Sequence, residues 1–288
     1  MKHIIVIPVF NDWKSLNKLL LQLNKNLKKP KKIIHEVLII NDNSSDEIKL
    51  QLKNLNVFKN IKVLSLNKNL GSQISIAIGL SYLKKIKEDF YITVMDADGE
   101  DNPKQVNKML NEAMNYKDFV ITSNRKKRKE ALIIIFLYKI HLLITFLFTM
   151  KWISFGNFST FYSKNLKSLL SNNSSVYAHS SSVLKNCDCK RLYAKREKRF
   201  FDKSKLGLMA LIDHSLRVNS VFYINIIFSS IFYSILLLFF IESYYVYLLL
   251  FLILIFNFLI FLVKIRLWKL KLNKLNFYIK NIKLFKTA

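Results

Sequence analysis

Cysteine and closely spaced glycine are scarce in this sequence, and the scarcity argues against several kinds of protein. Only two cysteines occur, Cys187 and Cys189, and their separation by a single residue does not suit a disulfide framework. The 5 histidines are scattered, so no pair completes a zinc site with these thiols, and we expect them to be structural. Free thiols indicate the reducing cytoplasm. The glycines form neither a dinucleotide-binding fingerprint nor a P-loop, which disfavours a dehydrogenase.

Acidic side chains are also few, because 19 aspartates and glutamates stand against 46 lysines and arginines and leave a formal net charge of +27. Such a balance indicates nucleic acid or an anionic membrane as a partner. The basic residues cluster at 125–129, 185–205 and 264–286, beside apolar segments. A membrane surface is therefore the favoured partner. Nucleic-acid binding is not expected, since the sequence has no platform of interleaved aromatic and basic residues.

Two long runs without a charged residue, 222–241 and 244–263, lie in the last third of the chain. Each is long enough as a helix to cross the ~30 Å core of a bilayer. Only two residues separate the runs, so the sequence predicts a transmembrane hairpin over 219–265, followed by a basic cytoplasmic tail at 266–288. Because basic residues flank the hairpin, we expect a multi-pass inner-membrane protein whose catalytic domain is cytoplasmic. Burial of both runs in a large soluble core is the alternative.

Residues 131–150 are apolar as well, but polar side chains recur along them at helical spacing. A basic run precedes the segment, and we expect a helix that lies in the cytoplasmic interface of the membrane. A spanning helix is the alternative, although it would put the basic residues of 185–205 on the outer side. Residues 131–218 as a whole are predicted to complete the catalytic domain on its acceptor side.

Short runs rich in β-branched residues alternate with helical patterns in the first part of the chain. The segment from Trp13 to Leu27, for example, repeats leucine at helical spacing. This alternation predicts an α/β domain over 1–130, built on a mostly parallel, Rossmann-like sheet. The strands are expected at 3–9, 36–40, 61–66, 90–95 and 119–122.

Polar and acidic side chains follow the ends of these predicted strands. Because ligands of parallel α/β sheets bind at the carboxyl ends of the strands, this edge predicts a binding site. Asp96 and Asp98 follow the fourth strand, and in extended backbone residues two apart point the same way. Such a pair suits Mg²⁺ or Mn²⁺, which can neutralise charge on a departing nucleoside diphosphate. After the third strand, Gly71 opens a helix whose first amides can face phosphate.

Four motifs occur in the order typical of one enzyme family. They are IVIPVFND at residues 5–12, LIINDNS at 38–44, NLG at 69–71 and VMDADGEDNP at 94–103. Together they resemble the motifs of the family-2 glycosyltransferases, which have the GT-A fold. The branch that the chain resembles most is that of the polyprenyl-phosphate sugar transferases, many of which end in a membrane hairpin.

The resemblance implies a role for particular residues of this sequence. Asp96 and Asp98 would bind the metal and the diphosphate. The set expected to bind the nucleotide-sugar donor is Pro8, Val9, Asn11, Asp12, Asp42, Ser44, Gly71, Asp96 and Asp98. Basic residues would face phosphate, because the guanidinium fork of arginine binds phosphate oxygens bidentately. The set expected to take part in catalysis is Asp98, Arg125, Arg128, Arg199 and Lys205.

Two positions depart from the pattern of the family. Asp202 replaces an expected glycine, so the loop there need not keep the same backbone. Asn157 stands where many relatives have an aspartate, and other acids are scarce between 131 and 205. A catalytic base is therefore hard to find unless Glu100 or Asp101 provides it.

This scarcity of a base bears on the acceptor. A hydroxyl nucleophile must lose a proton as it attacks, whereas a lipid phosphate is already anionic at neutral pH. The sequence therefore favours inverting transfer of a sugar to a polyprenyl phosphate. Two alternatives stay open, a glycan or lipid hydroxyl as acceptor in envelope polysaccharide synthesis, and an inactive membrane-bound scaffold. The sugar, the nucleotide and the oligomeric state are not specified by the sequence.

Overall fold

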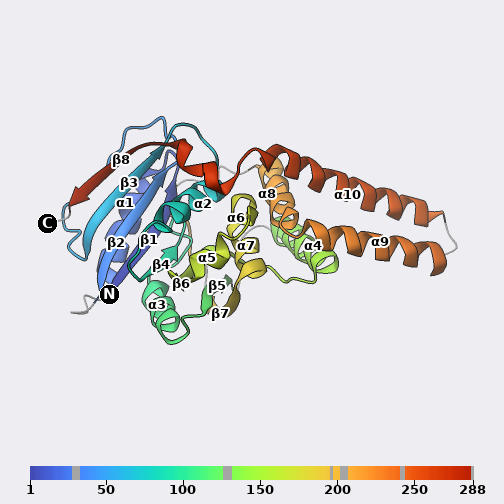
Figure 1. The fold of residues 1–288 in the computed structure, drawn as a ribbon, viewed down its shortest axis with the longest axis horizontal. Helices are drawn as coiled ribbons and strands as arrows, with labels where there is room; N and C mark the ends of the chain where they lie inside the picture. The colour runs from blue at the N-terminus through green and yellow to red at the C-terminus, as the bar shows by residue number, and fades with distance from the viewer. Residues whose placement is uncertain (28–32, 126–131, 195–196, 202–206, 241–243, 287–288) are drawn as a thin grey trace.

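The computed structural model describes residues 1–27, 33–125, 132–194, 197–201, 207–240 and 244–286. An eight-stranded sheet with helices on both faces forms one end of the molecule (Figure 1). Two long antiparallel helices project from the other end. The predicted α/β architecture is confirmed.

The sheet has the strand order β7-β5-β6-β4-β1-β2-β3-β8. Its strands are β1 (Lys2–Val9), β2 (Ile34–Asn41), β3 (Phe58–Leu66), β4 (Phe90–Val94), β5 (Phe119–Arg125), β6 (Phe155–Tyr162), β7 (Asp188–Ala194) and β8 (Ile279–Lys286). Strands β1 to β4 run parallel, while β6 lies antiparallel between β4 and β5. The carboxyl ends of β1 to β4 therefore meet at one edge. The five predicted strands are confirmed, whereas β6, β7 and β8 were not expected.

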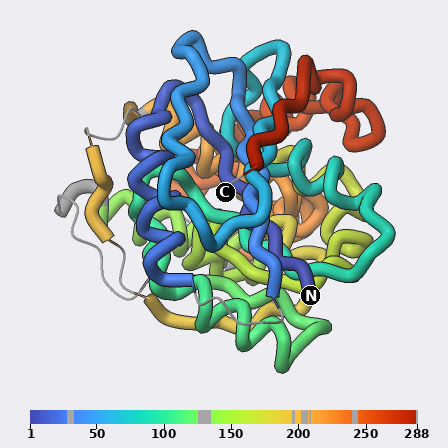
Figure 2. The backbone as a smooth tube through the Cα atoms, turned by 90° about the vertical axis from the view of Figure 1, so that its left-hand side faces the viewer, coloured from blue at the N-terminus to red at the C-terminus, as the bar shows by residue number. Residues whose placement is uncertain are grey.

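The central strands are buried on both faces, which is typical of parallel sheets. In β1, for example, Ile5 and Ile7 pack on one face, while Ile4 and Val6 pack on the other. Helices α1 (Trp13–Asn26) and α3 (Gln105–Asn115) cover the first face, and α2 (Ser72–Leu83) covers the second. Figure 2 shows α1, in dark blue, along one side of the sheet, while the red chain that leads into β8 approaches from the other side.

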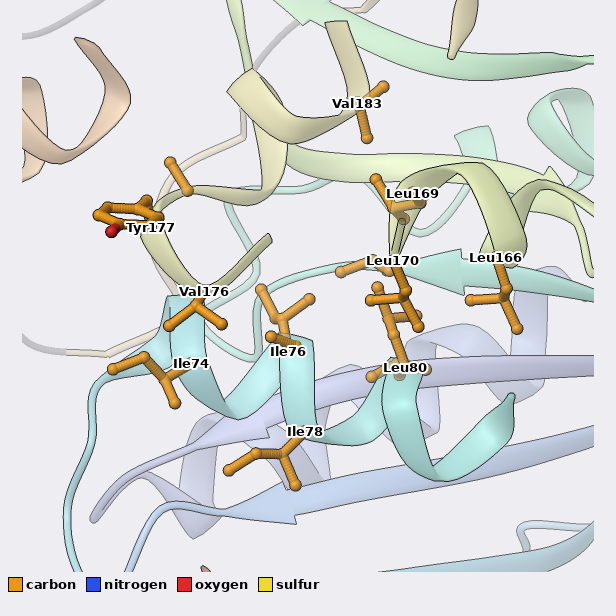
Figure 3. Packing of buried hydrophobic residues seen from close by; sticks show 14 of the residues in the cluster. Ile74, Ile76, Ile78, Leu80, Leu166, Leu169, Leu170, Val176, Tyr177 and Val183 are labelled. Atoms are coloured by element: carbon orange, nitrogen blue, oxygen red, sulfur yellow. The ribbon is translucent and has the colours of Figure 1, made fainter. Parts of the chain in front are cut away.

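Helix α2 is enclosed on all sides, which explains why its sequence is apolar all round. On its outer side lie three short helices, α5 (Asn165–Leu169), α6 (Ser174–Tyr177) and α7 (His179–Asn186). Figure 3 shows Ile76 of α2 near Val176, on the side away from the sheet, and Ile78 turned toward the sheet. The position of α2 is thus fixed by packing, which matters because its first turn belongs to the site described below.

Four further helices follow, α4 (Leu132–Thr149), α8 (Leu208–Ser220), α9 (Tyr223–Phe240) and α10 (Tyr245–Trp268). By length and composition α10 could cross a membrane, and only 17% of its most apolar window is buried. Helices α8 and α9 meet at 90° and pass the same test only as a bent pair. The hairpin of α9 and α10 matches the two predicted runs, while its insertion as a multi-pass unit stays a prediction.

Helix α4 lies alongside α9. The hydroxyl of Tyr233 in α9 donates a hydrogen bond to the carbonyl of Leu147 at 2.7 Å. The ring of Phe148 packs against that of Phe256 in α10, with ring centroids 4.9 Å apart. The helix thus packs against the hairpin, and whether it lies in the membrane interface stays a prediction.

The segment that we expected to be a basic tail, 266–288, differs from that expectation. After α10 the chain forms a 3-10 helix (Leu272–Tyr278) and then β8, which pairs antiparallel with β3. Phe285, for example, lies opposite Ile61. The lysines of β8 line an edge strand, where they discourage pairing with another sheet. Residues 279–286 are therefore a strand of the sheet, and the cytoplasmic location of 266–288 stays a prediction.

Candidate functional site

The loops after β1 and β2 are joined by the side chain of Asn11. The side-chain Oδ1 of Asn11 accepts a hydrogen bond from the backbone N–H of Ser45 at 2.9 Å, and the backbone N–H of Asn11 donates to Oγ of Ser44 at 3.0 Å. Asn11 has a φ of 48°, a left-handed conformation that asparagine tolerates better than most residues. Its neighbour Asp12 caps helix α1 by accepting from the N–H of Ser15 at 3.3 Å. These residues, which were predicted to bind the nucleotide-sugar donor, therefore shape the rim of the site through contacts with one another.

Asp42 holds the loop after β3 in place. Its Oδ1 accepts from the N–H of Leu70 and its Oδ2 from the N–H of Gly71, each at 2.8 Å. Gly71 has a φ of 86°, which a side chain would oppose, and it immediately precedes α2. Burial raises the pKa of Asp42, and the two backbone donors oppose that rise. The N–H of Asp42 also donates to the carbonyl of Val9 at 2.9 Å, next to Pro8 in β1.

The two aspartates after β4 lie on the same loop with different partners. Oδ1 of Asp96 accepts from Nδ2 of Asn157 at 2.9 Å, and Oδ2 of Asp98 lies 3.2 Å from Nη2 of Arg199. The N–H of Asp96 donates to the carboxylate of Asp101 at 3.0 Å, so Asp101 helps to shape the loop. The structure therefore places Arg199 against Asp98, on the same loop as Asp96, while the binding of metal and diphosphate by these residues stays a prediction.

Residues 197–201 lie against this acidic loop. The N–H of Phe200 donates to the carbonyl of Asp98 at 2.9 Å, and the N–H of Glu197 donates to the carbonyl of Glu100 at 3.1 Å. Gly99 has a φ of 85°, and a Cβ there would lie 2.4 Å from the ring of Phe200. Only glycine fits beneath this ring without a shift. The close contact explains how Arg199, remote in sequence, reaches Asp98.

Three predicted catalytic residues cannot be placed by their side chains. Arg125 ends β5, and only its backbone is described. Arg128 and Lys205 lie outside the described residues, as does Asp202. Their proposed contact with phosphate stays a prediction.

A chain of hydrogen bonds behind Asp96 was not predicted. Asn157 of β6 accepts at Oδ1 from Nε2 of Gln73 at 3.0 Å, and Oε1 of Gln73 accepts from the backbone N–H of His179 at 2.8 Å. The imidazole of His179 is fully buried and lies 2.8 Å from Oγ of Ser159. Burial lowers the pKa of His179 to about 4, so the ring is neutral at physiological pH. Nothing in the spacing of these residues along the chain could have revealed the contacts.

Asp96 and Asp98 are the residues best suited to hold a divalent cation. Across the ranges that the structure describes, no group of three or more histidine, cysteine or acidic side chains could form a complete metal cage. Mg²⁺ needs no such cage, since it is commonly bound through one or two carboxylates together with substrate phosphates and water. The donor set therefore fits a metal that arrives with a diphosphate.

Comparison with known proteins identifies the family. The model of glycosyl transferase family 2 matches residues 4–183, and the chain belongs to this family. An uncharacterized glycosyltransferase of Synechocystis is 28% identical over 127 residues, covering 44% of this chain and 38% of that protein. The uncharacterized glycosyltransferase YkcC of Bacillus subtilis is 25% identical over 131 residues, covering 45% and 39%. The matched region thus spans about two fifths of each relative.

Among solved structures, glucosyl-3-phosphoglycerate synthase from Mycobacterium tuberculosis superposes with a TM-score of 0.53 and 10% identity. The match covers 78% of each chain. This likeness concerns the fold alone, and it agrees with the GT-A arrangement expected of the family. The predicted family is therefore confirmed, while the polyprenyl-phosphate branch stays a prediction.

Proposed function

We propose that this protein transfers a sugar, with inversion at the anomeric carbon, from a nucleotide-sugar donor to a polyprenyl phosphate at the cytoplasmic face of a membrane. The donor would bind at the carboxyl ends of β1 to β4. Membership of family 2 supports the class of reaction. The solved complex of glucosyl-3-phosphoglycerate synthase with Mn²⁺ and UDP supports a metal-bound nucleotide donor.

The acidic loop supports the donor half of this proposal. A divalent cation, Mg²⁺ or Mn²⁺, bound by Asp96 and Asp98 would neutralise the charge that develops on the leaving diphosphate. Arg199 lies against Asp98 and can bind a phosphate oxygen there through its remaining N–H groups. Asn11 and Asp42 keep the rim of the site in shape for the nucleotide, through the loop contacts described above.

The contact between α8 and the rim of the site is the observation that carries the acceptor half. Nη1 of Arg217 in α8 lies 3.9 Å from the point where a Cβ on Gly71 would stand. The same side chain donates to the carbonyls of Tyr177 and Val176 at 3.0 and 3.1 Å. Because α8 continues directly into α9, the site and the apolar hairpin are joined through one short helix. A phosphate carried by a membrane lipid could reach the donor by this route.

The residue that faces Asp96 also favours a phosphate as acceptor. Asn157 donates to Asp96 through an amide, which cannot serve as a general base. Asp101 is engaged with the backbone of Asp96. An acceptor that is already ionised avoids the need for a base at this position.

The proposal is tested by a transfer assay on membranes that contain the full chain. A panel of labelled nucleotide sugars is supplied with polyprenyl phosphate, and label is counted after extraction into organic solvent, with and without EDTA. We expect metal-dependent label in the lipid fraction for one donor. Label that accumulates in a glycan instead would move the acceptor to a hydroxyl, and failure to bind or turn over any donor would favour a scaffold.

A further inference from the structure

The hydrogen bonds behind Asp96 have a direction that is fixed at their far end. The backbone N–H of His179 can only donate, so the atom of Gln73 that faces it at 2.8 Å is the carbonyl oxygen. The amide nitrogen of Gln73 then points the other way and donates to Asn157 at 3.0 Å. Asn157 is thereby left with its own NH₂ group directed at Asp96, at 2.9 Å. The two amide orientations, which geometry alone often leaves ambiguous, follow here from one backbone donor.

The three residues that form these hydrogen bonds come from elements that are held independently. Gln73 lies in the first turn of α2 and is 5% exposed, Asn157 lies in β6, and the N–H of His179 belongs to the first residue of α7. Packing fixes α2 between the sheet and the short helices, as described above. Hydrogen bonds in such surroundings are stronger than in water, and a buried polar group left without a partner is costly. Neither amide can turn over without losing a hydrogen bond.

We propose that Gln73 is a positioning residue for the metal site, because it holds Asn157 as a hydrogen-bond donor to the carboxylate of Asp96. This hydrogen bond fixes the orientation of the Asp96 carboxylate. This inference rests on the proposed function only in assigning the metal to Asp96 and Asp98. Partners that orient metal ligands in this way typically contribute about 10- to 100-fold in metal affinity.

Gln73→Glu provides the sharpest test. The introduced carboxylate can still accept from the N–H of His179, but when ionised it has no hydrogen to donate to Asn157. Asn157 must then turn its NH₂ toward position 73 and present its oxygen to Asp96. The two oxygens repel each other, so the carboxylate of Asp96 is no longer held in one orientation. We expect Mn²⁺ to bind about tenfold or more weakly than in the unaltered protein at alkaline pH. An additional negative charge acting only through its field would have the opposite effect and tighten binding of the cation.

Acidification should reverse the defect of Gln73→Glu. A protonated carboxyl can accept at one oxygen and donate at the other, which restores the direction of the chain. The affinity of Gln73→Glu for Mn²⁺, compared with that of the unaltered protein, should therefore recover as the pH is lowered from about 9 to about 6, the range in which a buried carboxyl titrates. Gln73→Met, which can neither accept nor donate in this way, should bind Mn²⁺ weakly throughout that range. A role in packing alone would give no such contrast between the two variants.

The experiment measures Mn²⁺ binding to the full chain in detergent by electron paramagnetic resonance, without donor or acceptor. Ser181→Ala is the matched control, since it removes a buried hydroxyl of α7 that donates to the carbonyl of Val218 at 2.9 Å and bonds to none of the three residues of the network. We expect the control to bind like the unaltered protein, with Gln73→Glu weakened and rescued by acid. Equal affinity of all four proteins at every pH would overturn the positioning role while leaving the proposed function standing. Absence of Mn²⁺ binding to the unaltered protein would overturn the metal site itself.

Discussion

Sugar transfer by Asp98→Asn is expected to fall by about 100- to 1,000-fold. The substitution removes the negative charge that faces Arg199 at 3.2 Å and that would hold the metal against the diphosphate. Groups that stabilise charge developing in a transition state typically contribute effects of this size. Because the side chain keeps its shape, the loop should be preserved, and the loss should appear mainly in kcat. The rate of label transfer from donor to lipid measures the effect.

Glu112→Gln is the matched control for Asp98→Asn. It also neutralises an acid that is paired with a basic side chain, since Glu112 lies 2.8 Å from Nζ of Lys190. This pair joins α3 and β7, away from the carboxyl ends of β1 to β4, and glutamine keeps the shape of the partly buried Glu112 side chain. We expect the control to transfer sugar at the normal rate. Near-normal transfer by Asp98→Asn would remove this aspartate from the account of catalysis.

Asp42→Asn is expected to lower the melting temperature by roughly 3–10 °C and to raise the KM for the donor. Two effects compete in this variant. Replacing the carboxylate by an amide removes the cost of burying a negative charge, the same cost that raises the pKa of Asp42. However, an amide has only one acceptor oxygen for the two backbone donors. The NH₂ group of the asparagine would face the N–H of Leu70 or Gly71, where the carboxylate now accepts a hydrogen bond at 2.8 Å. Two donors would then face each other. An unpaired buried donor costs about 1–3 kcal/mol, so we expect the loss to exceed the relief.

The control for Asp42→Asn lies on the same loop. Asp46 is exposed, and its replacement by asparagine removes the same charge without touching the loop after β3. Thermal melting of both variants in detergent, together with the KM for the nucleotide-sugar donor, separates the loss of the hydrogen bonds from Leu70 and Gly71 from a general effect of charge. An unchanged melting temperature for Asp42→Asn would show that these two hydrogen bonds are dispensable.

The edge of the sheet that carries the site could be predicted from sequence because its information is local. Strand, turn and acidic pair follow one another directly at 90–98, and parallel strands must bring such turns to one edge. The alternation of strands and helices fixed the class of fold for the same reason. Arg199 was found through its resemblance to a family segment, although nothing local indicated that a glycine beneath Phe200 would let it reach Asp98.

The features that escaped prediction depend on contacts between distant segments. Gln73 looks like an ordinary residue at the start of a helix, and its importance arises only when β6 and α7 are placed beside it. Strand β8 carries a lysine at every third position, Lys280, Lys283 and Lys286, and its partner β3 lies far earlier in the sequence. From the sequence alone, residues 266–288 were therefore predicted to be a basic cytoplasmic tail. A single sequence does not disclose pairings of this kind.

Two acceptors that differ only in the phosphate distinguish a phosphate acceptor from a hydroxyl acceptor. Membranes containing the protein are supplied with the active nucleotide sugar and either polyprenyl phosphate or the corresponding polyprenol, and label in the lipid fraction is followed over time. We expect metal-dependent transfer to the polyprenyl phosphate and none above background to the alcohol. Transfer to polyprenol at a comparable rate would contradict this expectation, because a hydroxyl acceptor requires the base that Asn157 cannot provide.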